Sequence, residues 1–182
     1  MDTPDLLARL RSGDRQAFAA LVVRYQRPLF GFLGRMGCAP ALAEDLAQDA
    51  FVRAWQQLDR YRPEMGALST WLFTIARHLA INELGRSHHV RERPAAEDAP
   101  EPACPRPQPP EVLALAQQRQ RLHAALRQLS LADRSLLALA YVEELAMADI
   151  ARIEGCSVAA AKTRLTRARQ RLGRLLEPSD AY

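Results

Sequence analysis

Six basic side chains near the C-terminus are the residues of this sequence best suited to binding chemistry. Residues 157–176 contain one lysine and five arginines and no acidic residue. A helix with so one-sided a charge repels itself unless a polyanion lies nearby, and arginine favours bidentate contacts with phosphates and base edges. We therefore predict that this segment binds nucleic acid. The alternatives are a solvated basic face, a helix packed on an acidic partner, and an arginine content that reflects genome composition.

The residue types needed for enzymatic chemistry do not form a recognisable arrangement. The sequence shows no nucleophile–base pair and no phosphate-binding loop. Its cysteines, Cys38, Cys104 and Cys156, are odd in number and far apart, which supports neither a zinc site nor a disulfide framework. His88 and His89 are adjacent in a polar stretch and are interpreted as solvated. We therefore expect no catalytic residue, no metal site, no cofactor and no small-molecule substrate.

A second polar group lies in residues 41–58, which read ALAEDLAQDAFVRAWQQL. Four polar side chains share one helical face at three- and four-residue spacing: Asp45, Gln48, Asp49 and Gln56. An apolar stripe occupies another face: Leu46, Ala50, Phe51, Ala54 and Leu58. Two carboxylates one turn apart mildly destabilise an isolated helix. The pattern indicates either an ordinary solvated face or a docking surface for a basic partner.

Aromatic and basic side chains occur together in residues 61–86. Tyr61 and Arg62 precede a predicted helix over residues 67–86. One set of side chains on this helix is expected to lie in the core: Trp71, Leu72, Ile75, Ala76 and Leu79. Another set forms a polar and basic face: Arg77, His78, Asn82 and Arg86. Stacking surfaces beside positive charge are typical of single-stranded DNA binding, although an aromatic stripe at helical spacing is more often part of a core.

The apolar spacing that positions these groups is helical, and no alternating strand pattern is evident. Eight helices are predicted, over residues 4–11, 14–36, 40–58, 67–86, 111–128, 131–142, 146–153 and 157–176. Asp14 and Ser157 are expected N-caps, and Ser130 has the spacing of a capping box. Pro40 suits a first helical turn, whereas Pro28 is expected to kink or interrupt its helix. The predicted fold class is all-α.

A proline-rich segment, residues 90–111 (VRERPAAEDAPEPACPRPQPPE), divides the chain. It contains seven of the twelve prolines, which remove backbone donors and disfavour helix. We interpret it as a flexible linker between two small helical domains, residues 1–89 and 112–182. The second domain has 11 basic and 7 acidic residues, so its charge alone equals the +4 of the whole chain. No signal peptide and no apolar run of about 20 residues is evident, which predicts a soluble, cytoplasmic protein.

A helix-turn-helix is predicted near the C-terminus, because a short helix at 146–153 and a break at Gly155 precede the basic helix. The side chains expected to pack inward are Ala148, Ile150, Ala151, Ile153, Val158, Ala161, Leu165, Ala168 and Leu172. The first part of such a second helix reaches base edges in the major groove. The candidates for base edges or nearby phosphates are Lys162, Thr163, Thr166 and Arg167. Arg164, Arg169 and Arg171 are expected to hold phosphates or acidic residues of the protein itself.

These groups, in this order and joined by a proline-rich linker, resemble the extracytoplasmic-function (ECF) sigma factors of bacterial RNA polymerase, within the sigma-70 family. The resemblance covers nearly the whole chain. Five stretches carry it: AFAALVVRYQRPLFGFLGRM, AEDLAQDAFVRAW, RPEMGALSTWLFTIARHLAINELGR, LRQLSLADRSLLALAYVEEL and DIARIEGCSVAAAKTRLTRARQRL. It implies that residues 1–89 form the helical bundle of sigma region 2 and that residues 112–182 form the helix-turn-helix of sigma region 4.

The resemblance also implies a partner for each group. Asp45, Gln48 and Asp49 would dock on the clamp helices of the polymerase beta-prime subunit, with the beta flap as a further contact. Six residues would recognise and melt the −10 promoter element: Tyr61, Arg62, Arg77, His78, Asn82 and Arg86. Five would read the −35 element: Lys162, Thr163, Arg164, Thr166 and Arg167. The implied function is transcription initiation at specific promoters, in a stress or envelope response and under an anti-sigma factor, with the polymerase rather than this chain as the enzyme.

The sequence departs from the family pattern at several positions. His78 stands where family members commonly have asparagine, and Gly85-Arg86 stands where two adjacent basic residues are usual. Ala146 replaces the usual serine N-cap, which costs about 1 kcal/mol of helix stability. Two other functions remain open from the residues alone: a helix-turn-helix regulator that acts without polymerase, and an interaction protein held mostly by an anti-sigma partner.

Overall fold

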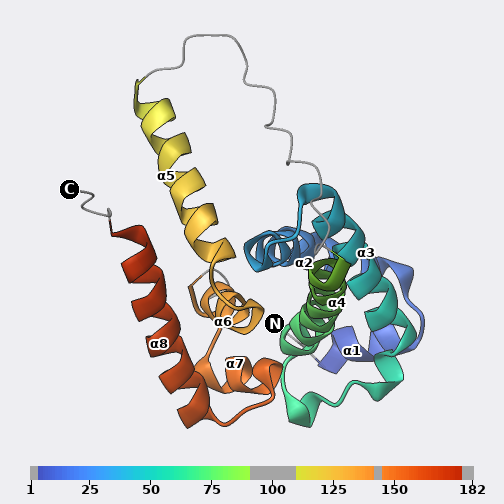
Figure 1. Ribbon diagram of the computed structural model, residues 1–182. Helices are drawn as coiled ribbons and strands as arrows, with labels where there is room; N and C mark the ends of the chain where they lie inside the picture. Colours follow the sequence, from blue (N-terminus) through green and yellow to red (C-terminus); the bar gives the residue numbers. More distant parts are fainter. Residues whose placement is uncertain (1–3, 91–109, 142–144, 178–182) are drawn as a thin grey trace, which may run out of the picture.

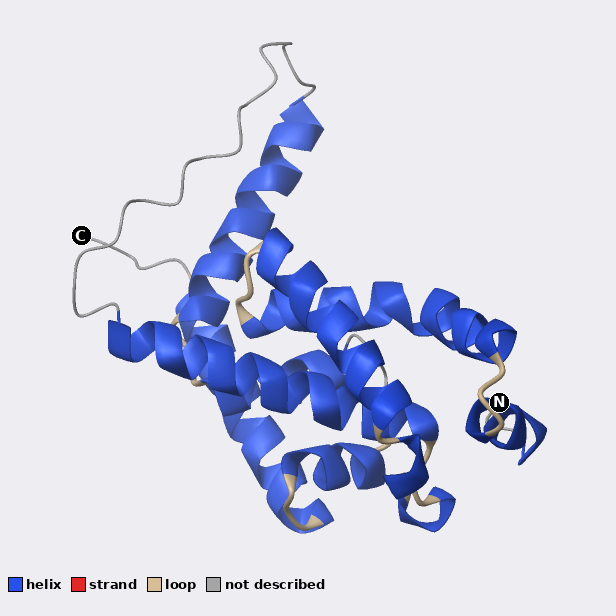
Figure 2. Ribbon diagram, turned by 90° about the vertical axis from the view of Figure 1, so that its right-hand side faces the viewer, coloured by secondary structure: helices blue, strands red, loops and turns tan. Residues whose placement is uncertain are grey.

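The computed structural model describes residues 4–90, 110–141 and 145–177, and every regular element in these ranges is helical (Figure 1; Figure 2). The α-helices are α1 (Pro4–Arg11), α2 (Arg15–Met36), α3 (Pro40–Gln56), α4 (Leu68–Val90), α5 (Pro110–Arg127), α6 (Leu131–Tyr141), α7 (Met147–Glu154) and α8 (Val158–Leu176). Two 3₁₀ turns, η1 (Leu58–Arg60) and η2 (Pro63–Met65), lie between α3 and α4. The predicted all-α fold class is confirmed. None of the described helices has the length and apolar content that a membrane span needs.

The helix starts follow the capping residues that the sequence predicts. The Asp14 carboxylate accepts hydrogen bonds from the backbone N–H groups two and three residues on, at 2.8 and 3.1 Å. Ser130 and Ser157 each accept one from the N–H three residues on, at 3.1 and 3.2 Å. Pro40 occupies the first position of α3, and Ala146 caps α7 with no side-chain hydrogen bond. These local signals therefore determine where α2, α3, α6 and α8 begin.

The sequence predicts that Pro28 kinks or interrupts its helix, and the structure shows that α2 is not interrupted. The helix continues from Arg15 to Met36 with Pro28 inside it. An internal proline costs about 3 kcal/mol, but Leu29, Phe32, Leu33 and Met36 in the following turns are all fully buried. Each such side chain contributes roughly 1.5–3 kcal/mol by leaving water. Packing of the second half of α2 thus outweighs the lost backbone hydrogen bond.

Several boundaries differ from the prediction by a few residues. Helix α3 ends at Gln56, and Leu58 instead begins η1. Helix α4 continues to Val90 and α5 begins at Pro110, so helix covers both edges of the predicted linker. A proline is tolerated at a first helical position because its missing N–H would have no intrahelical partner there. The rest of the predicted linker, residues 91–109, lies outside the described residues.

The N-terminal helices form a bundle around α2. Helices α2, α3 and α4 pack on one another, and Phe32 meets Phe73 edge to face with ring centroids 5.4 Å apart. A second apolar cluster joins α1 to the start of α2 and to the loop before α4 through Leu10, Leu21 and Tyr61. This bundle fixes the orientation of α3 and α4, which carry the candidate site residues of the first half.

The C-terminal helices form the expected helix-turn-helix. Helices α6 and α7 both pack on α8, and α5 lies beside α8 at one edge of the molecule (Figure 1). Ala161 and Ala168 of α8 are fully buried, as predicted, while Leu165 and Leu172 are half-buried. The prediction was wrong for Ala148 and Val158, which are exposed. Ala148 lies in the first turn of the short helix α7, and Val158 is the first residue of α8. These first turns project beyond the packed faces of their helices.

The two halves pack directly against each other. Helix α2 contacts α6, and α4 contacts α7. One apolar cluster contains residues of both halves, including Phe32 and Phe73 from the first and Leu139 and Ile150 from the second. The Arg134 guanidinium of α6 adds a polar contact. It donates 3.0 Å to the carbonyl at the end of α2, where a cation is favoured by the helix dipole.

Replacing Gly37 by alanine is expected to destabilise the protein by about 2–4 kcal/mol. Gly37 ends α2 with a φ of 102°, which costs an L-residue about 1–2 kcal/mol. Its Cβ would also lie 2.5 Å from an Arg134 nitrogen and displace the hydrogen bond between the halves.

Gly13→Ala is the matched control, because its φ is 80° but nothing lies within 4 Å of the added Cβ. Urea unfolding of both variants should give a loss of about 1 kcal/mol for Gly13→Ala and a larger one for Gly37→Ala. Equal losses would show that the Arg134 contact contributes nothing.

Candidate functional site

The acidic group of α3 is presented to solvent as one face. Asp45, Gln48 and Asp49 are all exposed. The opposite face of the same helix is buried against α2 and α4 through Leu46, Ala50 and other residues of the apolar stripe. No ion pair within the described residues involves Asp45 or Asp49. The two carboxylates are therefore available to a basic partner.

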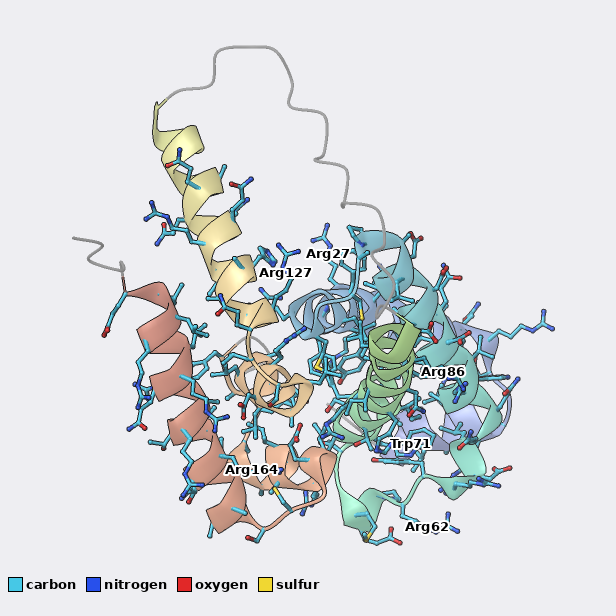
Figure 3. All side chains as sticks on the ribbon, viewed as in Figure 1. Arg27, Arg62, Trp71, Arg86, Arg127 and Arg164 are labelled. Atoms are coloured by element: carbon cyan, nitrogen blue, oxygen red, sulfur yellow. The ribbon has the colours of Figure 1, made fainter. Side chains whose placement is uncertain are left out.

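A pocket of about 360 Å³ lies where the loop before α4 meets the first turns of that helix. Its lining includes Arg62, Met65, Trp71, Thr74 and, from α7, Arg152. Figure 3 shows Arg62 in this loop and Trp71 on the first turn of α4. The pocket combines a half-buried indole, an exposed methionine and basic side chains. Such a lining suits an unpaired base, which can stack on the ring while the cations face its phosphates.

Tyr61 also lines this pocket, although most of its side chain is buried. The residue is only 4% exposed, and its ring lies 5.4 Å from that of Trp71. Its hydroxyl donates a 3.0 Å hydrogen bond to the carbonyl of Gly66. The contact of Tyr61 with DNA stays a prediction, and the residue has a structural role as well. The ring supports Trp71 and holds the loop in place, because it fills the apolar cluster beneath α1 and η1.

The polar face of α4 is divided between exposed and buried positions. His78, Asn82 and Arg86 are exposed, and Arg86 lies 4.0 Å from Glu83. Arg77, by contrast, donates from Nε and Nη2 to the carboxylate of Glu154 on α7, at 2.8 and 2.9 Å. Its side chain is 13% exposed. Arg77 is thus not available on the open face in this arrangement, because the second half of the chain covers it.

The basic surface of α8 is exposed along its first half. Lys162, Thr163, Arg164, Thr166 and Arg167 are all solvent-exposed. The two threonine hydroxyls donate to backbone carbonyls one turn earlier, at 3.0 and 3.1 Å. Within the described part of the chain, no ion pair involves the three cations. The first half of α8 therefore carries unneutralised positive charge.

The later arginines of α8 contact the protein itself. Arg171 forms a 2.8 Å ion pair with Asp133 of α6. Arg169 lies over the ring of Tyr141 at 6.0 Å from its centroid. The expectation that Arg171 holds an acidic residue of the protein is confirmed. Both contacts fix the second half of α8 on α6, which orients its first half outward.

The described residues offer no activated nucleophile at these surfaces. Cys38 is buried, and loss of hydration raises the pKa of its thiol to about 11, although the nearby Arg134 opposes the shift. At neutral pH the thiol therefore stays protonated and is a poor nucleophile. No cluster of three or more metal-ligating side chains occurs in the described ranges.

Comparison with known protein families matches both halves of the chain to the same class. The family model described as Sigma-70 region 2 matches residues 21–89, and the one described as Sigma-70, region 4 matches residues 119–172. The RNA polymerase sigma-H factor of Pseudomonas aeruginosa is 32% identical over 95% of this chain and 93% of its own length. The ECF RNA polymerase sigma-E factor of Escherichia coli has the same identity and coverage. The chain therefore belongs to the sigma-70 family, in the ECF group.

Solved structures agree with this assignment. CnrH in complex with the cytosolic domain of CnrY is 26% identical and superposes with a TM-score of 0.71 over 96% of this chain and 97% of the other. RpoE of Bartonella quintana, in complex with the anti-sigma factor NepR, is 29% identical with a TM-score of 0.65 over 89% and 98%. The fold of both helical units is therefore that of known sigma factors.

Sequence reasoning missed three parts of the candidate site. The sequence predicts Trp71 in the core, but this half-buried residue also lines the pocket. Met65 is 71% exposed and lines the pocket, and the sequence pattern does not indicate it. Arg152 also reaches this pocket, and it comes from the other half of the chain. The aromatic type of Trp71 was a usable signal, whereas nothing in the local sequence indicates the position of Arg152.

Proposed function

We propose that this chain is a promoter-specific sigma factor that binds core RNA polymerase, directs it to −10 and −35 elements and promotes melting of the duplex. The observation that carries the proposal is the match of both family models on one chain, in the order region 2 then region 4. Each matched half presents an exposed surface of fitting chemistry. A role in a stress or envelope response is part of the proposal, because the chain belongs to the extracytoplasmic-function group.

The acidic face of α3 is proposed to dock on the clamp helices of the beta-prime subunit. Asp45 and Asp49 are exposed and unpaired within the described residues, and Gln48 lies between them. Two carboxylates in a rigid helix position steer a basic partner and set the register of the complex. The beta flap is proposed as the contact of the C-terminal half.

The pocket at the start of α4 is proposed to capture a base of the melted −10 element. Arg62, His78, Asn82 and Arg86 would lie along the path of the strand, and Trp71 would stack on the extruded base. Flipping a base out of a duplex costs a few kcal/mol, which stacking and hydrogen bonding in a pocket offset. Arg77 could join this surface only after its ion pair with Glu154 is broken.

The first half of α8 is proposed to read the −35 element from the major groove. Replacing Arg167 by alanine is expected to weaken binding to the preferred duplex by about 1–3 kcal/mol and to relax selectivity at one position. Arg174→Ala is the matched control. Arg174 is also exposed but lies in the last turn of α8, away from the groove-reading end, so its loss should act equally on all sequences.

Both effects are measured by competition binding, with the chain bound to core polymerase. The competitors are duplexes that each carry one base substitution. A uniform loss for Arg167→Ala across all duplexes would instead identify Arg167 as a phosphate contact.

The chain is proposed to have no catalytic activity of its own and to act in the cytoplasm with the polymerase. An anti-sigma factor is a proposed regulator, since the similar RpoE was solved in complex with the anti-sigma factor NepR. The anti-sigma factor would bind to one of the exposed surfaces described above. No small-molecule substrate is proposed.

Affinity purification with purified core polymerase tests the proposal. The full-length chain is expected to associate with core in low salt and to compete with another sigma factor for it. Absence of association would refute the sigma function. It would favour the alternative of a helix-turn-helix regulator that binds duplex DNA without polymerase.

A further inference from the structure

The side of α8 that points directly away from the protein is an uncharged stripe. Ala161 and Ala168 of this helix are fully buried against the neighbouring helices. Successive residues of an α-helix are about 100° apart around its axis. The residues on the opposite side are therefore Ala159, Thr163, Thr166 and Gln170, and all four are exposed. Helix α8 lies at one edge of the molecule (Figure 1), which leaves this stripe open to solvent.

Basic side chains lie on both sides of the stripe. Lys162 is on one side and Arg167 is on the other, and both are exposed. Positive charge attracts the phosphates of any duplex and supplies affinity without sequence information. The first part of a recognition helix faces the base edges. Thr163 and Thr166 are therefore the polar side chains that point most directly at those edges.

The hydroxyl protons of both threonines are already used within the helix. The Thr163 hydroxyl donates to the carbonyl of Ala159 at 3.0 Å, and the Thr166 hydroxyl donates to the carbonyl of Lys162 at 3.1 Å. A hydroxyl has one proton and two acceptor lone pairs, so each of these hydroxyls can only accept a hydrogen bond from DNA. The branched side chain carries a methyl group on the same carbon. Each threonine thus presents an acceptor beside an apolar group.

This combination matches one kind of base pair in the major groove. An A·T pair presents the adenine amino group as a donor and the thymine C5-methyl group as an apolar surface. A G·C pair presents the cytosine amino group but no methyl group, and its guanine edge carries only acceptors, which repel the hydroxyl lone pairs. Residues three apart in a helix are separated by about 4.5 Å along its axis, and stacked base pairs by about 3.4 Å. Neighbouring base pairs therefore fit the two threonines.

We propose that Thr163 and Thr166 select two neighbouring A·T pairs in the upstream promoter element. Each hydroxyl accepts a hydrogen bond from an adenine amino group, and each threonine methyl packs on a thymine methyl. The inference rests on the proposed function, because it concerns the helix assigned to the −35 element. It names the base pairs that this helix selects, and it assigns their selection to uncharged residues that lie between the cations.

Selection from duplexes with a randomised upstream element, with the full-length chain bound to core polymerase, tests the inference. Thr163→Val and Thr166→Val keep the shape and a methyl group of threonine but remove the acceptor. The wild type is expected to enrich two neighbouring A·T pairs. Each valine variant should weaken the preference at one of these pairs about three- to tenfold, the effect of one lost hydrogen bond, and keep the preference at the other. Arg174→Ala is the control, and it should lower binding to all duplexes equally.

Two base analogues in the enriched duplex separate the hydrogen bond from the methyl contact. Purine in place of adenine removes the amino group, and deoxyuridine in place of thymine removes the C5-methyl group. At the pair that responds to Thr166→Val, purine should weaken wild-type binding about three- to tenfold more than it weakens binding of the variant. Deoxyuridine should weaken both proteins by a similar factor of about four. Any effect of an analogue on base pairing is the same for both proteins and cancels in this comparison.

Unchanged preferences in both valine variants would overturn the inference. The same conclusion would follow from enrichment of G·C pairs at the positions that respond to these variants, or from equal sensitivity of the wild type and the variants to purine. These outcomes leave the proposed function in place, because the wild type still selects an upstream element. A wild type without any preference among the duplexes would instead refute the −35 assignment, and the inference with it.

Discussion

Reversing both carboxylates of the acidic face, Asp45→Lys with Asp49→Lys, is expected to abolish binding to core polymerase while the fold survives. Both side chains are exposed and the apolar stripe of α3 is unchanged, so the free energy of unfolding should move little. Truncating a hydrogen-bonded interface charge costs about 2–5 kcal/mol, and reversal adds repulsion. The Kd for core should therefore rise at least about a thousandfold.

The control carries the same change in net charge outside the acidic face of α3. Asp59→Lys with Glu177→Lys also replaces two exposed acidic residues by lysine, in η1 and just after α8. Its affinity for core should stay within a fewfold of the wild type. Fluorescence anisotropy of labelled chain with core measures both Kd values. Equal increases of the Kd in the two double variants would show that the acidic face contributes only through its net charge.

Phe32→Ala is expected to lower the free energy of unfolding by about 3–5 kcal/mol, close to half of a typical domain's stability. Phe32 has no exposed surface, and its ring meets Phe73 in the cluster shared by both halves. The truncation leaves a cavity that close-packed neighbours fill only in part.

Phe30→Ala makes the same chemical change two residues earlier on α2. Phe30 is 43% exposed, so its truncation should cost about 1 kcal/mol or less. Urea unfolding of both variants by circular dichroism gives the comparison. Similar losses would contradict the assignment of Phe32 to the centre of the core.

The features that the sequence predicts well are those that depend on near neighbours along the chain. The caps at Asp14 and Ser157 and the exposed faces of α3 and α8 follow from spacing within one or two turns. For Arg171 the sequence predicts a contact with a phosphate or with an acidic residue of the protein, and the structure shows an ion pair with Asp133.

The features that the sequence does not reveal depend on residues far apart in the chain. Arg77 and Glu154 are separated by 77 positions, and nothing near either residue indicates the other. Tyr61 belongs to the loop that follows η1, yet its burial depends on α1 and α2, which precede it by 25 residues or more. Pro28 is a further example. Its effect on the helix cannot be predicted from neighbouring residues, because tertiary packing of α2 outweighs the tendency of proline to interrupt a helix.

The direct test of the central claim is transcription in vitro with purified core polymerase and a library of randomised promoters. Core alone and core with the wild-type chain are compared, and initiated transcripts are sequenced. The sigma function predicts transcripts that appear only when the chain is added and that share two sequence elements at a fixed spacing. Core-independent binding of the chain to duplex DNA, with no transcript gained on its addition, would contradict it.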